Sequence, residues 1–411
     1  MTKHIVIIGS ALSGNKGAAA MLESAVQTLG TALEPVEFTL LSMYPDEDAA
    51  LNLYPNLRIV DARPLELGVR INTLALVYRL LPPLRATMRK RYRAIRALAS
   101  ADALLDQGGI TFVDGREKFL LYNVASILPA LNMKVPVVKC AQALGTFRNP
   151  INRWAATTFL PKMATIVSRG AVTQQHLDEL GLTNTVPGAD YAFLLELTDA
   201  EKAEAEQHFD RAFFDTDRKV VGLSPSVVMQ KNIDGAGGDY AGELVEFMRW
   251  LIDERGYRVA LIPHSVRTGT DKTHNNDLPL CRDLAARFGP SDDLLFIETE
   301  MSSQGLRHVI GLCDLFVASR FHAMVSSLAM AVPTLVIGWS HKYQEVLDMF
   351  GLAEWAFGRD KFSQAHLRER FDALAANEDE VRGKLRESLP AVKDKARVQV
   401  DEIVRIAVGS R

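Results

Sequence analysis

The chain has 411 residues, of which 48% are hydrophobic and 24% charged, a globular composition that excludes disorder, collagen and coiled coil as the main architecture. Lys and Arg number 47 and Asp and Glu 50, so the formal net charge of −3 gives no overall field for holding nucleic acid. The three cysteines lie far apart in apolar settings, which excludes a disulfide framework and a zinc knuckle and favours a reducing compartment.

The N-terminal sequence argues against export. The apolar run at residues 5–8 is too short for a signal-peptide core, and no small-residue cleavage site follows it. No stretch reaches the roughly 18 uninterrupted apolar residues of a membrane-spanning helix. We therefore expect a cytoplasmic protein whose contact with a membrane, if any, is at the surface.

The first half of the chain alternates short apolar runs with longer helical patterns. Valine and isoleucine dominate most of the runs, as expected of buried strands. A helix with apolar residues on one side is predicted over residues 18–29. This alternation is typical of parallel βαβ units. Strands are predicted over residues 5–8, 38–42, 104–105, 135–140, 165–168 and 186–189.

A charged stretch at residues 196–217 interrupts this alternation, which then resumes. We predict an α/β protein of two Rossmann-like domains whose parallel sheets face a central cleft. The first spans 1–197 with a basic helical insertion at about 64–99, the second spans 218–378, and a charged helix over 379–411 crosses back over the first. In the second domain, strands are predicted over 219–224, 258–263, 294–298, 315–318 and 334–338, and helices over 241–255, 278–288, 302–312, 322–330 and 344–350.

The loops after the strands are the places to look for a site. In parallel sheets ligands bind at the carboxyl ends of the strands, and a cleft between domains is the usual pocket. The first such loop contains Asn15 and Gly17 among small residues and opens a helix, whose free N–H groups attract an anion. Its spacing matches neither a dinucleotide fingerprint nor a P-loop, so a turn that only packs strand on helix is the alternative.

Polar residues and glycines follow other strands of the first domain. Asp106 and Asp114 are candidates for accepting hydrogen bonds from sugar hydroxyls, and Gly108 and Gly109 allow a substrate to approach the backbone. A tight turn with solvated acids is the alternative. Gln142 is placed at a strand end, where its amide is expected to orient a polar ligand.

Charged side chains at strand ends point to an anionic ligand. Arg169 stands where a buried strand meets a helix, and its planar fork matches a carboxylate or a phosphate. A salt bridge to a neighbouring acid is the alternative. In the second domain Ser224 and His264 follow two strands, but a lone histidine is more often structural, so His264 is a secondary candidate.

The strongest candidate site is the turn formed by Ser319, Arg320, Phe321 and His322. It follows an apolar strand and opens a helix, so a hydroxyl, a guanidinium and an imidazole meet at a helix N-terminus. Lys342 follows the next strand and adds a further cation. We expect these cations and the guanidinium of the first domain to converge on one cleft, where unpaired cations would repel each other without an anionic ligand.

In the order and spacing of these motifs, the chain resembles the polysaccharide pyruvyl transferase family over residues 5–355. The most specific match is residues 319–322, followed by Val332-Pro333 and Lys342. Ala18 and Ile110 stand where the family often has an acid and a glycine. The other matching pieces are Asn15-Lys16-Gly17, Gln107-Gly108-Gly109 with Asp114, Ala141-Gln142 through Gly145, Val167-Ser168-Arg169 and Ala189-Asp190.

The resemblance implies a fold like that of the B-type glycosyltransferases and a bacterial-type role in exopolysaccharide or cell-envelope glycan synthesis. Members move the enolpyruvyl unit of phosphoenolpyruvate onto two hydroxyls of a sugar, forming a ketal and releasing phosphate, with no cofactor or metal. By this resemblance Arg169, Arg320 and Lys342 bind the phosphate and carboxylate of the donor, and His322 is the acid–base residue. Asp190 and the other matched polar residues are expected to bind substrate, with the acceptor on the first domain.

Two other functions remain open from the sequence. One is a nucleotide-sugar glycosyltransferase or hexosamine epimerase of the same fold, although the second domain has no clear acidic signature for binding ribose. The other is a non-catalytic glycan-binding protein. The sequence also leaves open the oligomeric state and the form of the acceptor, which is a nucleotide sugar, a lipid-linked oligosaccharide or a polymer.

Residues 67–99 differ from the rest of the chain because an apolar stretch at 74–84 runs into a group of basic residues. Such a segment can lie on an anionic membrane surface, which would suit a lipid-linked acceptor. A solvated helix face is the alternative. The basic residues are Arg85, Arg89, Lys90, Arg91, Arg93 and Arg96.

Overall fold

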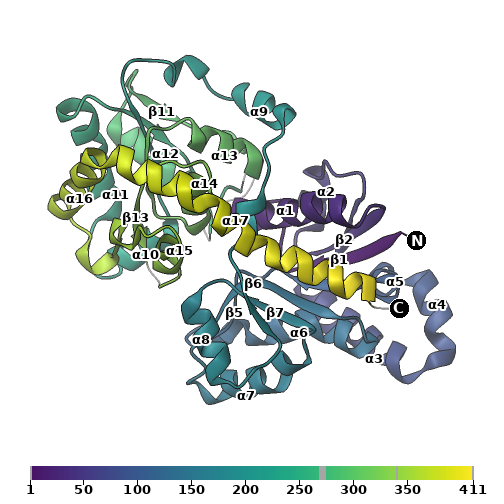
Figure 1. Ribbon diagram of the computed structural model, residues 1–411. Coiled ribbons are helices and arrows are strands. Elements are labelled where there is room, and N and C mark those ends of the chain that lie inside the picture. The colour runs from purple at the N-terminus through teal and green to yellow at the C-terminus, as the bar shows by residue number, and fades with distance from the viewer. Residues whose placement is uncertain (1, 268–274, 339–340, 410–411) are drawn as a thin grey trace. The chain divides into compact units, whose positions relative to one another are not determined.

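The computed structural model describes residues 2–267, 275–338 and 341–409. These residues form two compact units, each built around its own sheet (Figure 1). The first unit comprises Met1–Ser13, Ala18–Leu195 and Lys393–Arg411, and the second comprises Gly14–Gly17 and Glu196–Val392.

The first unit has an eight-stranded sheet among its described residues, in the order β3-β2-β1-β4-β6-β7-β8 with β5 paired to β6. Every pairing is parallel. The central strand β1 is fully buried from Ile5 to Ile8, as expected where helices cover both faces of a sheet. The strands are β1 (Lys3–Ile8), β2 (Val36–Ser42), β3 (Leu57–Asp61), β4 (Ala103–Asp106), β5 (Ile110–Val113), β6 (Val137–Gly145), β7 (Thr165–Ser168) and β8 (Thr185–Pro187).

Helix α7 of the first unit begins where the sequence supplies a capping group. It starts after Asn149, whose side chain accepts hydrogen bonds from the N–H groups of Ile151 and Asn152, with Pro150 in the first helical position. The helices are α1 (Lys16–Ala32), α2 (Pro45–Ala50), α3 (Asn72–Leu80), α4 (Arg85–Arg91), α5 (Arg93–Ser100), α6 (Leu120–Met133), α7 (Pro150–Phe159) and α8 (Ala171–Glu179). A π-helical turn, Glu66–Ile71, leads into α3.

The second unit has a six-stranded sheet among its described residues, in the order β11-β10-β9-β12-β13-β14. All of its pairings are parallel as well. The strands β10, β9 and β12 are neighbours, so the loops at their carboxyl ends meet at one edge of the sheet. The strands are β9 (Val220–Ser224), β10 (Arg258–Leu261), β11 (Leu294–Phe296), β12 (Leu315–Ala318), β13 (Thr334–Gly338) and β14 (Ala356–Gly358).

Two helices of the second unit start directly at this edge of the sheet. Helix α10 follows β9 and is capped by the Ser226 hydroxyl, which accepts a hydrogen bond from the N–H of Val228. Helix α14 follows β12, and Arg320 occupies its N-cap position without a side-chain cap. The helices are α9 (Asp199–Glu206), α10 (Val227–Asp234), α11 (Tyr240–Arg249), α12 (Leu278–Phe288), α13 (Ser303–Gly311), α14 (Phe321–Ala329), α15 (His341–Asp348) and α16 (Gln364–Ala376). The last helix, α17 (Glu378–Gly409), begins in the second unit, and its residues from Lys393 on belong to the first.

The predicted fold class, α/β with parallel Rossmann-like sheets, is confirmed. Three strands were absent from the prediction: β3, β5 and β14. Each is at most five residues long, and none alternates clearly, so the apolar pattern did not reveal them. The predicted strand at 135–140 is instead β6, which continues to Gly145. The predicted helix at 241–255 ends its α-helical part at Arg249 and finishes as a π-helical turn, Trp250–Glu254.

The described helices include none that is both long enough and apolar enough to cross a membrane. Among the described residues, no group of three or more His, Cys, Asp or Glu side chains is arranged to hold a metal ion. Cys140, Cys281 and Cys313 are all buried and free, and burial raises the pKa of each thiol.

Candidate active site

The carboxyl edge of the second sheet gathers most of the polar residues predicted there. Ser224 ends β9, and its carbonyl accepts a hydrogen bond of 2.9 Å from the N–H of Ser319, which follows β12. The Ser319 hydroxyl accepts a hydrogen bond of 2.8 Å from Tyr240. The Ser224 Oγ atom is buried and makes no hydrogen bond with any described residue. This edge therefore has a fixed backbone and an unsatisfied buried hydroxyl.

Arg320 is held by an acid that the sequence prediction did not identify. Its Nε and one Nη atom donate to the two carboxylate oxygens of Asp277 at 2.7 and 2.6 Å, and the other Nη donates to Asn275 at 2.7 Å. Burial would lower the pKa of Arg320, but the charge and hydrogen bonds of Asp277 raise it. The premise of unpaired cations is thus wrong for Arg320. Two of its five N–H donors still make no hydrogen bond with a described residue.

Phe321 brings His322 and Lys342 together at the start of α14. The Phe321 and His322 ring centroids are 5.0 Å apart, edge to face, and the Lys342 ammonium lies 4.7 Å from the Phe321 centroid. Phe321 and Lys342 are buried and His322 is half-buried. An ammonium over an aromatic ring is stabilised by the ring quadrupole, so one buried ring positions both side chains.

His264 is buried at this edge of the sheet, and nearby basic side chains act on its pKa. It is only 4% exposed, and its ring makes no hydrogen bond with a described residue. Burial lowers its pKa well below the usual value, and the positive charges of His322, Arg320, Arg307 and Lys16 lower it further. Four basic side chains therefore act on His264, and two of them, Arg320 and Lys16, are paired with Asp277 and Glu300.

The lowered pKa of His264 makes the stability of the protein dependent on pH. Below about pH 6.5 the His264 imidazole is protonated in the unfolded state but stays neutral in the folded state. We therefore expect the free energy of unfolding to decrease as the pH falls below about 6.5, and His264 to have no effect on it above about pH 6.5. The loss is about 1.4 kcal/mol per pH unit until the folded pKa is reached. Urea denaturation of wild type and His264→Asn between about pH 5 and 8 measures it. Parallel curves for the two proteins would contradict the prediction.

The predicted residues of the first loop, Asn15 and Gly17, lie in the segment that clusters with the second unit. Asn15 forms an antiparallel bridge with Ser265, and its side chain accepts a hydrogen bond of 3.1 Å from the N–H of Gly17. A Cβ atom on Gly17 would lie 2.0 Å from Nδ1 of His322, so only glycine leaves room for this imidazole. The buried Lys16 pairs with Glu300 at 2.7 Å.

In the first unit, Asp106 and Gln142 are engaged within the protein. Asp106 lies in β4, is 1% exposed, and forms a buried ion pair with Lys139. Its other oxygen accepts a hydrogen bond of 3.0 Å from the N–H of Gly108. The position predicted for Gln142 is wrong, because it lies inside β6 rather than after a strand. Its amide donates to the Asp106 carbonyl at 2.6 Å and accepts from Thr111.

Arg169 and Asp190 form a buried pair, 3% and 0% exposed, with 3.3 Å between Nη1 and Oδ2. The salt bridge that the sequence left open as an alternative is thus present. Asp190 also accepts a hydrogen bond of 3.0 Å from the N–H of Ala192. Gly109 lies beside this arginine, with Nη1 of Arg169 3.8 Å from the position a Cβ would take. The polar residues of the first sheet edge therefore form a tightly paired cluster.

Asp114 is held by hydrogen bonds, unlike the ion-paired Asp106 and Asp190. It accepts hydrogen bonds from Thr146 at 2.9 Å, from the N–H of Arg148 at 2.6 Å and from Asn152 at 2.7 Å. Burial acts to raise its pKa, but these hydrogen bonds outweigh it and lower the pKa. The side chain thereby fixes the loop before α7.

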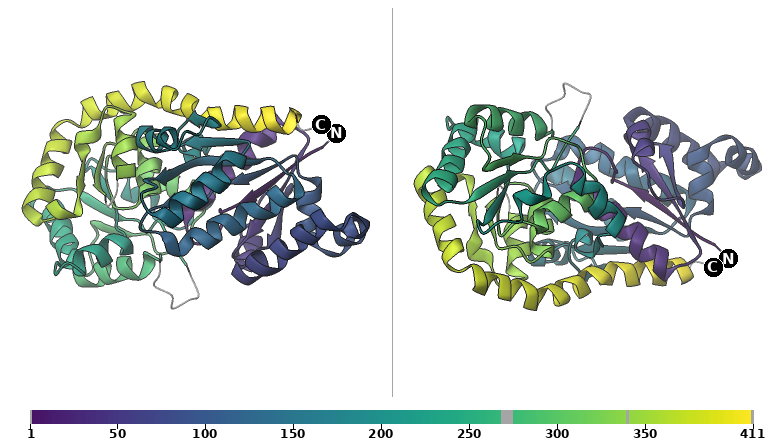
Figure 2. Two further views of the ribbon diagram at one scale, coloured as in Figure 1. Left: turned by 90° about the horizontal axis from the view of Figure 1, so that it is seen from below. Right: turned by 90° about the horizontal axis from the view of Figure 1, so that it is seen from above.

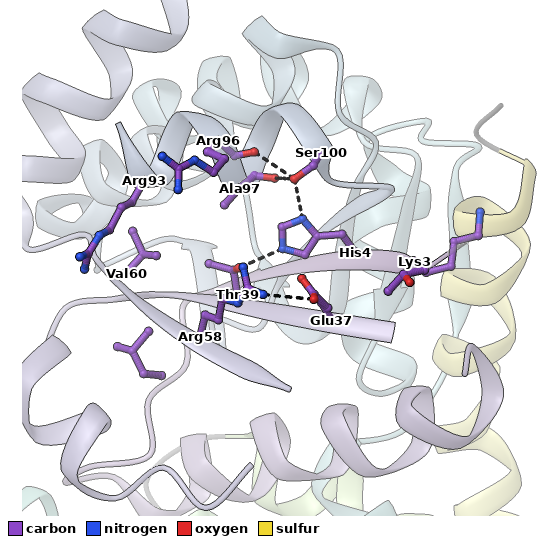
Figure 3. A pocket seen from close by; sticks show the side chains of 12 residues that line it. Lys3, His4, Glu37, Thr39, Arg58, Val60, Arg93, Arg96, Ala97 and Ser100 are labelled. Atoms are coloured by element: carbon purple, nitrogen blue, oxygen red, sulfur yellow. Dashed lines mark hydrogen bonds and ion pairs between the residues drawn. The ribbon is translucent and has the colours of Figure 1, made fainter. Parts of the chain in front are cut away.

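A separate cavity of about 440 Å³ opens at the amino-terminal end of the first sheet, where the sequence prediction placed no site (Figure 3). The His4 ring bridges Ser100 at 2.8 Å and Thr39 at 2.9 Å, and burial lowers its pKa. Arg58 and Arg93 also line it. The cavity is assembled from four separate segments, and no motif in the sequence marks it.

The structure thus sorts the predicted residues between two sheet edges. Ser224, His264, Ser319, Arg320, Phe321, His322 and Lys342 lie in the second unit with Asn15 and Gly17, whereas Asp106, Gly108, Gly109, Asp114, Gln142, Arg169 and Asp190 lie in the first. The convergence of Arg169 with Arg320 and Lys342 stays a prediction. Asp277, Arg307 and Tyr240 were missed, because nothing in the sequence around them distinguishes them from the other charged and aromatic residues of the chain.

Comparison with known proteins gives both a family and a fold. The family model for polysaccharide pyruvyl transferase matches residues 15–341. The amylovoran biosynthesis protein AmsJ of Erwinia amylovora is 22% identical over 397 residues, covering 92% of this chain and 93% of that protein.

Solved structures of low identity share the fold. The UDP-GlcNAc 2-epimerase of Methanocaldococcus jannaschii has a TM-score of 0.56 at 14% identity, covering 90% of this chain and 92% of that one. The α,α-trehalose-phosphate synthase of Burkholderia vietnamiensis has a TM-score of 0.57 at 12% identity, covering 99% of each chain. At such identities the likeness concerns the fold, which is that of the B-type glycosyltransferases and related epimerases. Since the family model spans most of the sequence, the chain belongs to the polysaccharide pyruvyl transferase family.

Proposed function

We propose that this transferase moves the enolpyruvyl unit of phosphoenolpyruvate onto two hydroxyls of a sugar in an exopolysaccharide or cell-surface glycan, or in its precursor, and releases phosphate. The observation that carries the proposal is the geometry at the carboxyl edge of the second sheet, where Arg320 occupies the N-cap position of helix α14 and the buried Phe321 ring contacts both His322 and Lys342. A donor with a phosphate and a carboxylate needs several cations. In this proposal the anions are bound by the two N–H donors of Arg320 that make no hydrogen bond with a described residue, by the Lys342 ammonium and by the first N–H groups of α14.

The proposed chemistry assigns a separate task to each group. A proton passes from His322 to C3 of the donor, which leaves an oxocarbenium-like centre at C2 for the first sugar hydroxyl to attack. The second hydroxyl then attacks C2 as the C2–O bond to phosphate breaks, and the hydroxyl protons are returned through the same imidazole to solvent or phosphate. Arg320 and Lys342 stabilise the charge on the departing phosphate. Asp277 is a positioning residue, because its carboxylate holds the guanidinium of Arg320 and accepts hydrogen bonds from the N–H groups of Val227 and Ser265.

The acceptor is proposed to be a glycan or glycan precursor, in agreement with a relative named for amylovoran biosynthesis. Three buried free cysteines suit a reducing compartment, so we place the reaction in the cytoplasm. Incubating the protein with phosphoenolpyruvate and a panel of free sugars, nucleotide sugars and lipid-linked oligosaccharides tests the function. Acceptor-dependent phosphate release, with a ketal on the product seen by mass spectrometry, is the expected result. No phosphate release with any acceptor would argue against it.

Thermal unfolding with different ligands separates this proposal from a nucleotide-sugar enzyme of the same fold. Phosphoenolpyruvate at 100 times its dissociation constant is expected to stabilise the protein by about 2.7 kcal/mol. We do not expect a UDP-sugar at the same concentration to bind as a donor and raise the unfolding temperature. Inorganic phosphate serves as the control for stabilisation by a non-specific anion. A shift with the UDP-sugar and none with phosphoenolpyruvate would favour the nucleotide-sugar enzyme.

A further inference from the structure

The helical segment between β3 and β4 has an apolar stripe that no described residue covers. Leu65, Val69, Leu76 and Leu80 are 80%, 61%, 44% and 64% exposed. Their spacing of four, seven and four residues puts them on one side of a helix. Scattered exposed apolar residues are normal, whereas a group of this size marks an interaction surface.

A different stripe of the same helices already packs into the protein. Leu67, Ile71 and Ala75 are 1%, 1% and 0% exposed and belong to the buried clusters of the first unit. The fold of the unit therefore does not need the exposed stripe. Leu81 and Leu84 extend it past the end of α3 and are 48% and 45% exposed. Figures 1 and 2 show α4 at the outer end of the first unit, whereas α3 lies beside α6.

The same segment concentrates positive charge. Residues 67–99 contain eight Lys or Arg and no Asp or Glu, a charge of +8 in a chain of net −3, so the remaining residues carry −11. Arg89, Lys90, Arg91 and Arg93 are exposed, and no described carboxylate pairs with them.

Two further arginines order the segment without cancelling its charge. Arg85 donates to the carbonyls of Tyr78 and Arg79, which joins the start of α4 to the end of α3. Arg96 donates to the carbonyls of Arg89 and Lys90 in the same way, from α5 to α4. Because carbonyls are neutral partners, both guanidinium charges persist.

We propose that residues 65–96, the docking segment, bind the surface of a bilayer that contains anionic phospholipids. The leucines would enter the boundary between head groups and acyl chains while the basic side chains remain among the anionic head groups. A second copy of the chain fits this surface poorly, because a two-fold contact would bring together two docking segments that each carry a net charge of +7 (eight Lys or Arg and Glu66). The inference does not rest on the reaction proposed above.

Co-sedimentation of the full chain with vesicles tests the proposal. We expect binding to vesicles of phosphatidylcholine mixed with phosphatidylglycerol, weak binding to phosphatidylcholine alone, and release at high salt. The quadruple variant Arg89→Gln, Lys90→Gln, Arg91→Gln, Arg93→Gln is expected to bind roughly 10²–10³-fold more weakly, since each basic residue near an anionic surface contributes about fivefold. The variant Leu76→Ser, Leu80→Ser is expected to bind more weakly at every salt concentration.

The matched control removes the same charge elsewhere, with Lys361→Gln, Arg386→Gln, Lys395→Gln and Arg397→Gln at exposed positions, and is expected to bind like wild type. Circular dichroism checks that each variant folds, and phosphate release with a water-soluble acceptor is expected to be unchanged in all of them. Failure of wild type to bind anionic vesicles, or equal binding by the quadruple variant, would overturn the proposal. So would analytical ultracentrifugation that shows a dimer lost in the leucine variant without vesicle binding by wild type.

Discussion

Replacing His322 with alanine is expected to abolish phosphate release from phosphoenolpyruvate while leaving the fold intact. The imidazole is half-buried at the start of α14, against the Phe321 ring, and histidine is the side chain whose charge ordinarily changes near neutral pH. A positioned acid–base group contributes about 10²–10⁴-fold to rate, so the acceptor-dependent rate should fall by that factor. Arg320 and Lys342 remain, so phosphoenolpyruvate should still raise the melting temperature of the variant.

The matched control for this prediction is His208→Ala. His208 lies in the same unit and is 32% exposed at the side chain, 3.5 Å from Glu204 in a surface pair. We expect wild-type turnover in the control. Wild-type turnover in His322→Ala would remove His322 from the mechanism. Glycan binding by wild type and by both variants, with no phosphate release from any of them, would favour a non-catalytic glycan-binding protein. A pH–rate profile distinguishes proton transfer from positioning, because only the loss of an acid–base group removes a limb of that profile.

Breaking the ion pair between Asp106 and Lys139 is expected to give the largest loss of stability. Both side chains are almost completely inaccessible, at 2% and 0% exposure. Asp106→Ala leaves a buried ammonium without its carboxylate, which costs about 3–5 kcal/mol. Urea denaturation measures this loss as a lower midpoint at unchanged slope.

The double variant Asp106→Leu, Lys139→Met tests whether the pair is structural. With both charges replaced by apolar side chains, we expect most of the stability to return. If Asp106 instead contacts the acceptor, the double variant would fold but lose acceptor-dependent turnover. Glu380→Ala, which removes a surface partner of Lys384, is the control and should barely change stability. A loss in Asp106→Ala no larger than in this control would contradict the structural role.

The charge distribution within each sheet edge could be predicted only in part. The turn at residues 319–322 was recognisable because a hydroxyl, a guanidinium and an imidazole follow an apolar strand directly. The partner of its arginine was not, because Asp277 is 43 residues away along the chain. An ion pair of that kind depends on which loops meet at a sheet edge, and this is decided by strand order.

Gln142 shows the same difference within a single strand. The apolar pattern of β6 weakens after Cys140, so the strand was predicted to end there. In the structure β6 continues to Gly145, because the amide of Gln142 is satisfied by the Asp106 carbonyl and by Thr111. A buried polar side chain with both hydrogen bonds made is compatible with a strand interior, whereas the same side chain without partners is not.

By itself the sequence determined the parallel α/β class, the strands with long apolar runs, the polar turn at residues 319–322 that opens α14 and the basic, apolar segment before β4. These features depend on neighbours in the chain, through hydrophobic periodicity, helix termini and local charge. Only the tertiary structure decided that Arg320 is paired with Asp277 and that Asp106 forms a buried ion pair with Lys139. It also decided that the apolar stripe of the docking segment stays exposed. Pairing and burial depend on which distant segments share a surface, and strand order sets that through packing.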